Sequence, residues 1–261
     1  MSPGTTGLPK IVSDAETRST AVNRKNLWPG IGMLMLPVLL CASCEAHAQT
    51  TSTAYPKMAP LEQYLMQRDA EITLARSAAP ESISHDADVL VLGTHGYENA
   101  VKGKNGFVCI VLRSWTAQAG DPDFWNPKLR GPACFNAGGA RSYLPIVFKK
   151  TNLIVSGVSA EQMFATIKSS SAKHELSTLE PGSMCYMMSR DQYLGDAGKH
   201  WHPHLMFFLP ETTAMAWGAG LPGSPVIEAQ EPEDHLTIFM IPVGKWSDGT
   251  AAHSADHSGT H

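Results

Sequence analysis

Three histidines stand at alternate positions in the stretch GKHWHPHLMFFLPE: His200, His202 and His204. In an extended strand, alternate side chains point to the same face, so the three imidazoles would converge. Neutral imidazole is a common ligand of zinc and copper, and a His-x-His pair needs further ligands from elsewhere. We therefore predict a zinc or copper site built on His202 and His204. His200 would be peripheral, and Glu211 or His235 would complete the site.

The same histidines have a purely structural interpretation, in which they only make local hydrogen bonds where a strand begins. Pro203 removes one backbone donor and places the segment at a sheet edge or beside a bulge. Beyond His204 both faces of the strand are apolar, so the strand enters the core. A third alternative is a thiol–imidazole pair between Cys185 and one of these histidines.

The order of Gly195, His202, His204, Glu211 and Gly218 resembles the first metal motif of the cupins, where Gly, His-x-His, Glu and Gly recur on neighbouring strands. Six residues separate His204 from Glu211, more than that motif has, and no second motif follows. Helices are also expected upstream, and they do not belong in a small jelly roll. We do not assign the chain to that family.

The N-terminal segment, residues 1–48, has the pattern of a secretory signal. Arg24 and Lys25 precede an apolar stretch that ends in the small-residue sequence AHA at Ala48. Prolines and a glycine interrupt this stretch, whereas a membrane-spanning helix needs about 20 apolar residues. We expect a secreted or periplasmic protein that begins near Gln49 and has no membrane span after cleavage. The alternative is that the segment is retained as an anchor.

Charge and composition narrow the choice of partners. The 261 residues carry a formal charge of −4, and charged residues make up 17%, below the roughly 25% of typical domains. No run of Lys and Arg occurs, which argues against nucleic acid and anionic membranes as partners. A small molecule or a metal ion remains as the expected partner, and the oligomeric state is left open.

Periodicity predicts a single α+β domain over residues 59–246, with a mostly antiparallel sheet packed against two to four helices. A disordered lead-in, residues 49–58, would precede it, and a disordered histidine-containing tail, residues 247–261, would follow. Helices are expected over residues 60–79, 140–155 and 159–170. Strands are expected over residues 89–92, 107–112, 183–189, 204–210, 225–230 and 235–244. Residues 116–139 are predicted to be a long loop.

Three cysteines follow the predicted signal: Cys109, Cys134 and Cys185. An oxidising compartment would allow one disulfide, and Cys109 with Cys134 is the favoured pair. The alternative is that all three are buried small side chains. Together these features predict an exported ligand-binding or accessory module. The competing function is a metal-dependent enzyme built around His202 and His204.

Overall fold

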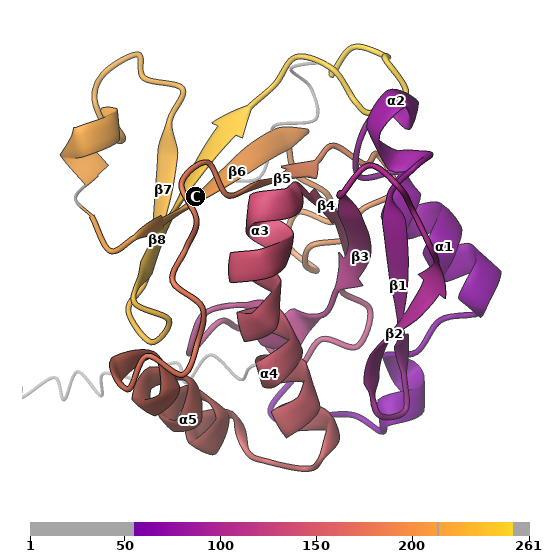
Figure 1. Ribbon diagram of the computed structural model, residues 1–261, viewed down its shortest axis with the longest axis vertical. Coiled ribbons are helices and arrows are strands. Elements are labelled where there is room, and N and C mark those ends of the chain that lie inside the picture. Colours follow the sequence, from indigo (N-terminus) through magenta and orange to yellow (C-terminus); the bar gives the residue numbers. More distant parts are fainter. Residues whose placement is uncertain (1–54, 213, 253–261) are drawn as a thin grey trace, which may run out of the picture. The chain divides into compact units, whose positions relative to one another are not determined.

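An eight-stranded sheet organises the protein, with the strand order β2-β1-β3-β4-β5-β6-β8-β7 (Figure 1). The computed structural model describes residues 55–212 and 214–252, so the predicted signal peptide lies outside the described residues. All neighbouring strands are antiparallel except β1 and β3, which are parallel. The strands are β1 (Asp88–Gly93), β2 (Gly96–Val101), β3 (Val108–Leu112), β4 (Gly131–Phe135), β5 (Met184–Met187), β6 (His204–Pro210), β7 (Ile227–Glu231) and β8 (Leu236–Pro242).

The described part of the chain contains five α-helices and three short 3₁₀ turns. The mostly antiparallel sheet with its helices confirms the predicted α+β class. None of the described helices is long and apolar enough to cross a membrane. The helices are α1 (Arg68–Arg76), α2 (Glu81–Ser84), α3 (Ala137–Ser142), α4 (Leu144–Val155) and α5 (Ala160–Ala172), and the 3₁₀ turns are η1 (Leu61–Gln63), η2 (Ser114–Thr116) and η3 (Ala214–Trp217).

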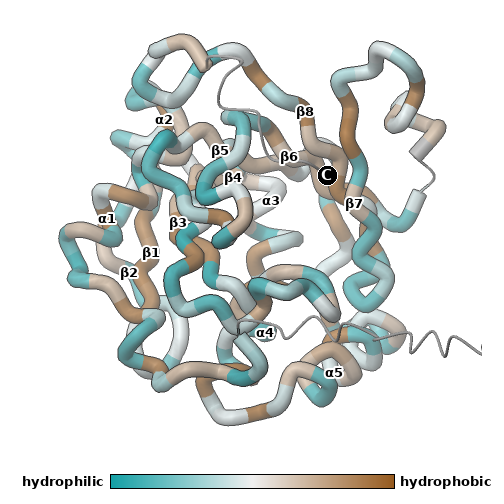
Figure 2. The backbone as a smooth tube through the Cα atoms, turned by 180° about the vertical axis from the view of Figure 1, so that it is seen from behind, coloured by the Kyte–Doolittle hydropathy of each residue, from teal (hydrophilic) through white to brown (hydrophobic). Residues whose placement is uncertain are grey.

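The helices lie on both faces of the sheet. In β3, Ile110 packs into the large core under α3, α4 and α5, whereas its neighbours Cys109 and Val111 pack into a second core under α1. Alternate residues of a strand point to opposite faces, so a strand that is apolar throughout must be covered on both sides. Figure 2 shows the side of α1, which lies beside β1.

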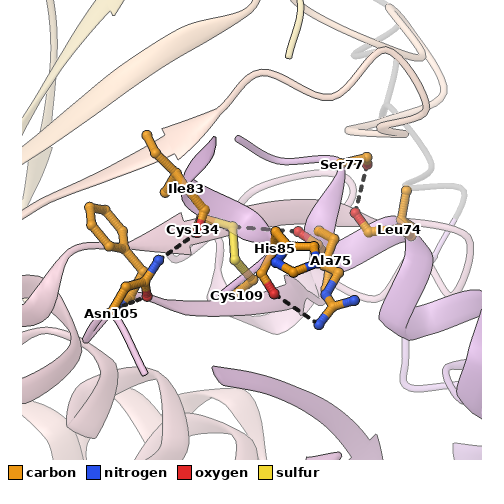
Figure 3. Close-up of a disulfide and its surroundings, with 10 residues drawn as sticks. Leu74, Ala75, Ser77, Ile83, His85, Asn105, Cys109 and Cys134 are labelled. Carbon is orange, nitrogen blue, oxygen red and sulfur yellow. Dashed lines mark hydrogen bonds between the residues drawn. A yellow bond between two sulfur atoms is a disulfide. The ribbon is translucent and has the colours of Figure 1, made fainter. Parts of the chain in front are cut away.

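A disulfide joins Cys109 and Cys134 under α1 (Figure 3). The two residues stand directly opposite each other on β3 and β4, and their Cα atoms are 4.0 Å apart. The Cys134 Sγ atom also lies 3.6 Å from the carbonyl oxygen of Ala75 in α1. The favoured cysteine pair is therefore confirmed. Cys185 is free and buried in the other core.

A buried ion pair holds α1 against the sheet. The Arg113 guanidinium donates to Glu71 Oε1 over 2.8 Å and to the carbonyl oxygen of Tyr64 over 2.8 Å. The same Glu71 oxygen accepts a hydrogen bond from the backbone N–H of Leu92 in β1. Both charged side chains are fully buried, so losing either one would leave the other unpaired, which typically costs about 3–5 kcal/mol.

α1 covers one face of the sheet over β1 and β3. On the same face, β6 and β8 are covered by the segment that joins β6 to β7. Trp217 of η3 stacks on Phe239 with ring centroids 4.8 Å apart, and it also contacts Phe207. This segment carries the exposed large hydrophobic side chains of the described residues, including Met215 and Leu221.

The predicted strands all occur, but two further strands lie where sequence patterns predicted loops. β2 forms within a polar, glycine-containing connection, and β4 lies inside the predicted loop of residues 116–139. A short strand such as β2 (Gly96–Val101), which is half exposed at the sheet edge, has no clear alternation of apolar residues. β4 is buried throughout, but its five residues include a glycine and a proline, which usually indicate a loop.

Two predicted helices are divided in the structure. The helix expected over residues 60–79 becomes η1, α1 and the start of a turn, and Gln67 caps α1 by accepting a hydrogen bond from the Ala70 N–H. The helix expected over residues 140–155 divides at Tyr143 into α3 and α4. Pro145 lies in the first turn of α4, where its missing N–H is tolerated. Ser159 caps α5 by accepting a hydrogen bond from the Gln162 N–H.

Both ends of the domain extend further than expected. In the predicted lead-in, Tyr55 donates a hydrogen bond to Asp196. In the predicted tail, the Ser247 N–H donates to the carbonyl oxygen of Met188, and residues 245–252 form a turn closed by backbone hydrogen bonds. Residues 55–58 of the predicted lead-in and residues 247–252 of the predicted tail therefore make contacts with the rest of the domain. Residues 49–54 and 253–261 lie outside the described residues.

Candidate functional site

The predicted metal ligands fall at opposite ends of β6. His204 is the first residue of the strand, and Glu211 follows its last residue, Pro210. Seven residue steps at about 3.3 Å each place the two positions about 23 Å apart along an extended chain. His235 precedes β8 and lies at the same end as Glu211, with its Nδ1 atom 3.8 Å from the Glu211 carboxylate. The structure therefore does not bring the five predicted ligands together.

The alternating arrangement of the three histidines is also incomplete. β6 begins only at His204, so His200 and His202 precede the strand instead of sharing its face. Pro203 explains this start, because it has no N–H to donate, although its carbonyl oxygen still accepts from the Val243 N–H. β6 pairs with β5, the strand that contains Cys185.

Burial and one hydrogen bond define the protonation state of the His204 imidazole. It is buried, and its Nδ1 atom lies 2.7 Å from the carbonyl oxygen of His202, so Nδ1 carries the proton and donates it. The Trp201 ring packs edge-on at 4.6 Å. Burial lowers the pKa of His204 to about 4, because a charged imidazolium would lose its hydration there. His200 packs instead against Trp246.

The residues described by the structure contain no cluster of three or more His, Cys, Asp or Glu side chains placed to hold a metal ion. The alternative thiol chemistry is also unfavourable. Burial raises the pKa of the Cys185 thiol well above its usual range, and an inert thiol is the expected consequence.

A pocket of about 400 Å³ lies at the other end of β6 and β8, between the hairpin that joins β7 to β8 and the segment that follows α5. We call it the Asp234 pocket. Its volume is within the range of small-molecule sites, and its lining combines apolar side chains with a few polar groups. The lining residues are Ile146, Ser171, Ala172, His174, Leu176, Ser177, Thr178, Leu179, Pro210, Asp234, His235 and Leu236.

Asp234 is the buried acid of this pocket. Its Oδ2 atom forms an ion pair with Lys150 Nζ over 2.7 Å, and both side chains are almost fully buried. Its Oδ1 atom is buried too, and no donor within the described residues reaches it. Buried polar atoms are nearly always hydrogen-bonded, so this orphaned acceptor beside the pocket has the capacity to take one further donor.

The hairpin between β7 and β8 explains how Asp234 reaches the interior. The Asp234 N–H donates to the carbonyl oxygen of Glu231, which closes a tight turn, and His235 then adopts a left-handed conformation with φ of 55°. This conformation is uncommon outside glycine, and histidine is among the residues that tolerate it better. The turn directs Asp234 toward Lys150 of α4 and leaves His235 at the pocket rim.

Glu231 adds a second buried carboxyl group beside this ion pair. It is the last residue of β7 and only 8% exposed. Burial raises the pKa of Glu231 to about 7, with Lys150 opposing this rise and Asp234 adding to it. The same two carboxyl groups, after burial itself, raise the pKa of the Tyr143 hydroxyl. One lysine therefore faces two buried acids.

The sequence analysis named His235, as a possible metal ligand, but it missed Asp234, Lys150 and Glu231. The position of Lys150 could have been recognised from the sequence, because this lysine lies on the apolar face of α4 between Ile146 and Ile154. A lysine at spacing i and i+4 from buried apolar residues predicts a buried acidic partner, although it cannot identify which one.

Comparisons with protein-family models, with curated proteins and with solved structures find no match to this chain.

Proposed function

We propose that this protein is an exported module that binds a small molecule in the Asp234 pocket. The observation that carries the proposal is the buried Oδ1 atom of Asp234, which lacks a donor among the described residues. An unsatisfied buried acceptor typically costs about 1–3 kcal/mol. A ligand N–H or O–H group at this atom would remove that penalty, so the pocket favours a ligand that carries a donor.

The remaining lining supports a ligand with an apolar body. Ile146, Leu179 and Leu236 contribute apolar surface, while Ser177 and Thr178 contribute exposed hydroxyl groups. Burial of apolar ligand surface contributes about 25 cal/mol per Å², and the polar groups fix its orientation. Binding rather than chemistry is the function that this arrangement supports best.

Export is supported by two independent features. The first 48 residues follow the pattern of a secretory signal, with basic residues, an apolar stretch and a small-residue exit. The disulfide between Cys109 and Cys134 is the second feature, since disulfides persist mainly in oxidising compartments.

The test is a fragment screen by protein-observed NMR on the purified protein and on Ser177→Trp. Ser177 is exposed and lines the pocket, so a tryptophan there should fill the space without disturbing the core. Ser156→Trp, at an exposed serine that does not line the pocket, is the matched control. We expect fragments with an N–H or O–H donor to shift the resonances of Ile146 and Leu236 in the natural protein and in the control.

Ser177→Trp should lose these shifts while keeping the rest of its spectrum. If the same fragments shift the pocket resonances equally in Ser177→Trp, or if shifts arise only elsewhere on the surface, the proposal is refuted.

A further inference from the structure

We infer that the Asp234 pocket selects ligands that carry a protonated amine, and that Glu231 supplies the negative charge responsible for this selection. The inference rests on the proposed ligand-binding function. It follows from the balance of the buried charges. Lys150, Asp234 and Glu231 are all at least nine-tenths buried, and one ammonium cannot neutralise two carboxylates.

Asp234 provides the contact for such a ligand. Its Oδ2 atom is engaged by Lys150, but its buried Oδ1 atom has no donor in the described part of the chain, and the residue lines the pocket. An ammonium group is a pure donor that suits an acceptor-only carboxylate. Charge-assisted hydrogen bonds of this kind are also about twice as strong as neutral ones.

Glu231 acts on the ligand through charge, because it does not line the pocket. When Glu231 is protonated, Lys150 and Asp234 form a neutral pair, and the site has no excess charge to attract a cation. When Glu231 is ionised, one negative charge remains uncompensated. That uncompensated charge raises the affinity for a cation, and we take the gain as on the order of tenfold, the factor that about 1.4 kcal/mol of Coulomb energy gives.

The groups that face Glu231 come from three elements. Lys150 of α4 and the Gln118 side chain from the loop after η2 favour its ionised form, whereas Asp234 and Glu233 in the turn disfavour it. Glu231 changes charge near neutral pH under these influences, within the range that an NMR or calorimetric titration covers. Binding of a cation should reciprocally favour the ionised form and release protons, because linkage acts in both directions.

Two probes of the same shape separate the two proposals. n-Butylammonium carries the cation, and n-butanol replaces it with a neutral hydroxyl donor. Each is titrated into the purified protein and into Glu231→Gln at pH 5.5 and pH 8. Binding is followed by the shifts of Leu236 and Ile146, and proton release is measured by calorimetry in two buffers of different ionisation enthalpy.

We expect n-butylammonium to bind about tenfold more tightly at pH 8 than at pH 5.5 and to release protons near pH 7. n-Butanol should show neither effect. Glu231→Gln should lose the proton release and that part of the pH dependence.

The inference is overturned if the natural protein binds n-butylammonium with equal affinity at both pH values. It is also overturned if Glu231→Gln shows the same pH dependence as the natural protein. If n-butanol binds in the pocket as tightly as n-butylammonium at pH 8, the charge selection is refuted while the ligand-binding function stands. If neither probe shifts the pocket resonances at either pH, both proposals fail.

Discussion

Replacing Glu231 with glutamine should stabilise the protein, and the gain should grow as the pH rises. The pKa of this carboxyl group rises from a usual value of 4.5 to about 7 in the folded state, chiefly through burial. Each pKa unit corresponds to 1.36 kcal/mol, so the shift amounts to about 3 kcal/mol. Because the folded state binds the proton more tightly than the unfolded state, folding stability falls as the pH rises from 4.5 to 7.

The expected difference in unfolding free energy between Glu231→Gln and the natural protein is therefore about 1 kcal/mol at pH 5 and about 3 kcal/mol at pH 8. Urea unfolding at both values measures it, provided that the m-value is unchanged. The glutamine amide keeps the size of the side chain and has no charge to bury. A difference that is the same at pH 5 and pH 8 would refute the reasoning, because a purely steric effect of the substitution does not titrate.

Three further predictions concern other parts of the chain. His204→Gln should gain stability relative to the natural protein as the pH falls from 6.5 to 4, by about 3 kcal/mol in urea unfolding, because the pKa of His204 is lowered to about 4; a pH-independent difference would contradict this. Cys109→Ala/Cys134→Ala should lose about 3.5 kcal/mol of unfolding free energy, since the disulfide closes a loop of 25 residues, and unchanged thermal unfolding would count against that value. Mature protein from the periplasm or medium should begin at or near Gln49 by intact mass, whereas an uncleaved N-terminus would contradict the predicted signal.

The strands that sequence patterns predict best are those with continuous apolar runs. β3 and β6 enter the buried part of the sheet, so their residues are apolar on both faces and the run itself is the signal. β2 gives no such signal, because it lies at the sheet edge and is half exposed. Cys109 and Cys134 could be chosen as a pair, although only the register of β3 against β4 places them opposite each other.

The candidate site was harder to predict, because its residues meet through long-range packing. The alternating histidines are a local pattern, and Pro203 ended that pattern by delaying the start of β6 to His204. Asp234 and Lys150 are 84 positions apart, and nothing in either segment identifies the other. A polar residue on an apolar stripe, such as Lys150, is the local signal that such a buried partner exists.

The most direct test of the central claim is a crystal structure of the protein soaked with the fragments that shift the pocket resonances. We predict that a bound fragment occupies the Asp234 pocket with an N–H or O–H group about 3 Å from Asp234 Oδ1. Its apolar part should lie against Ile146 and Leu236. The claim is contradicted if Oδ1 pairs with a donor of the protein itself and the fragments bind only outside the pocket.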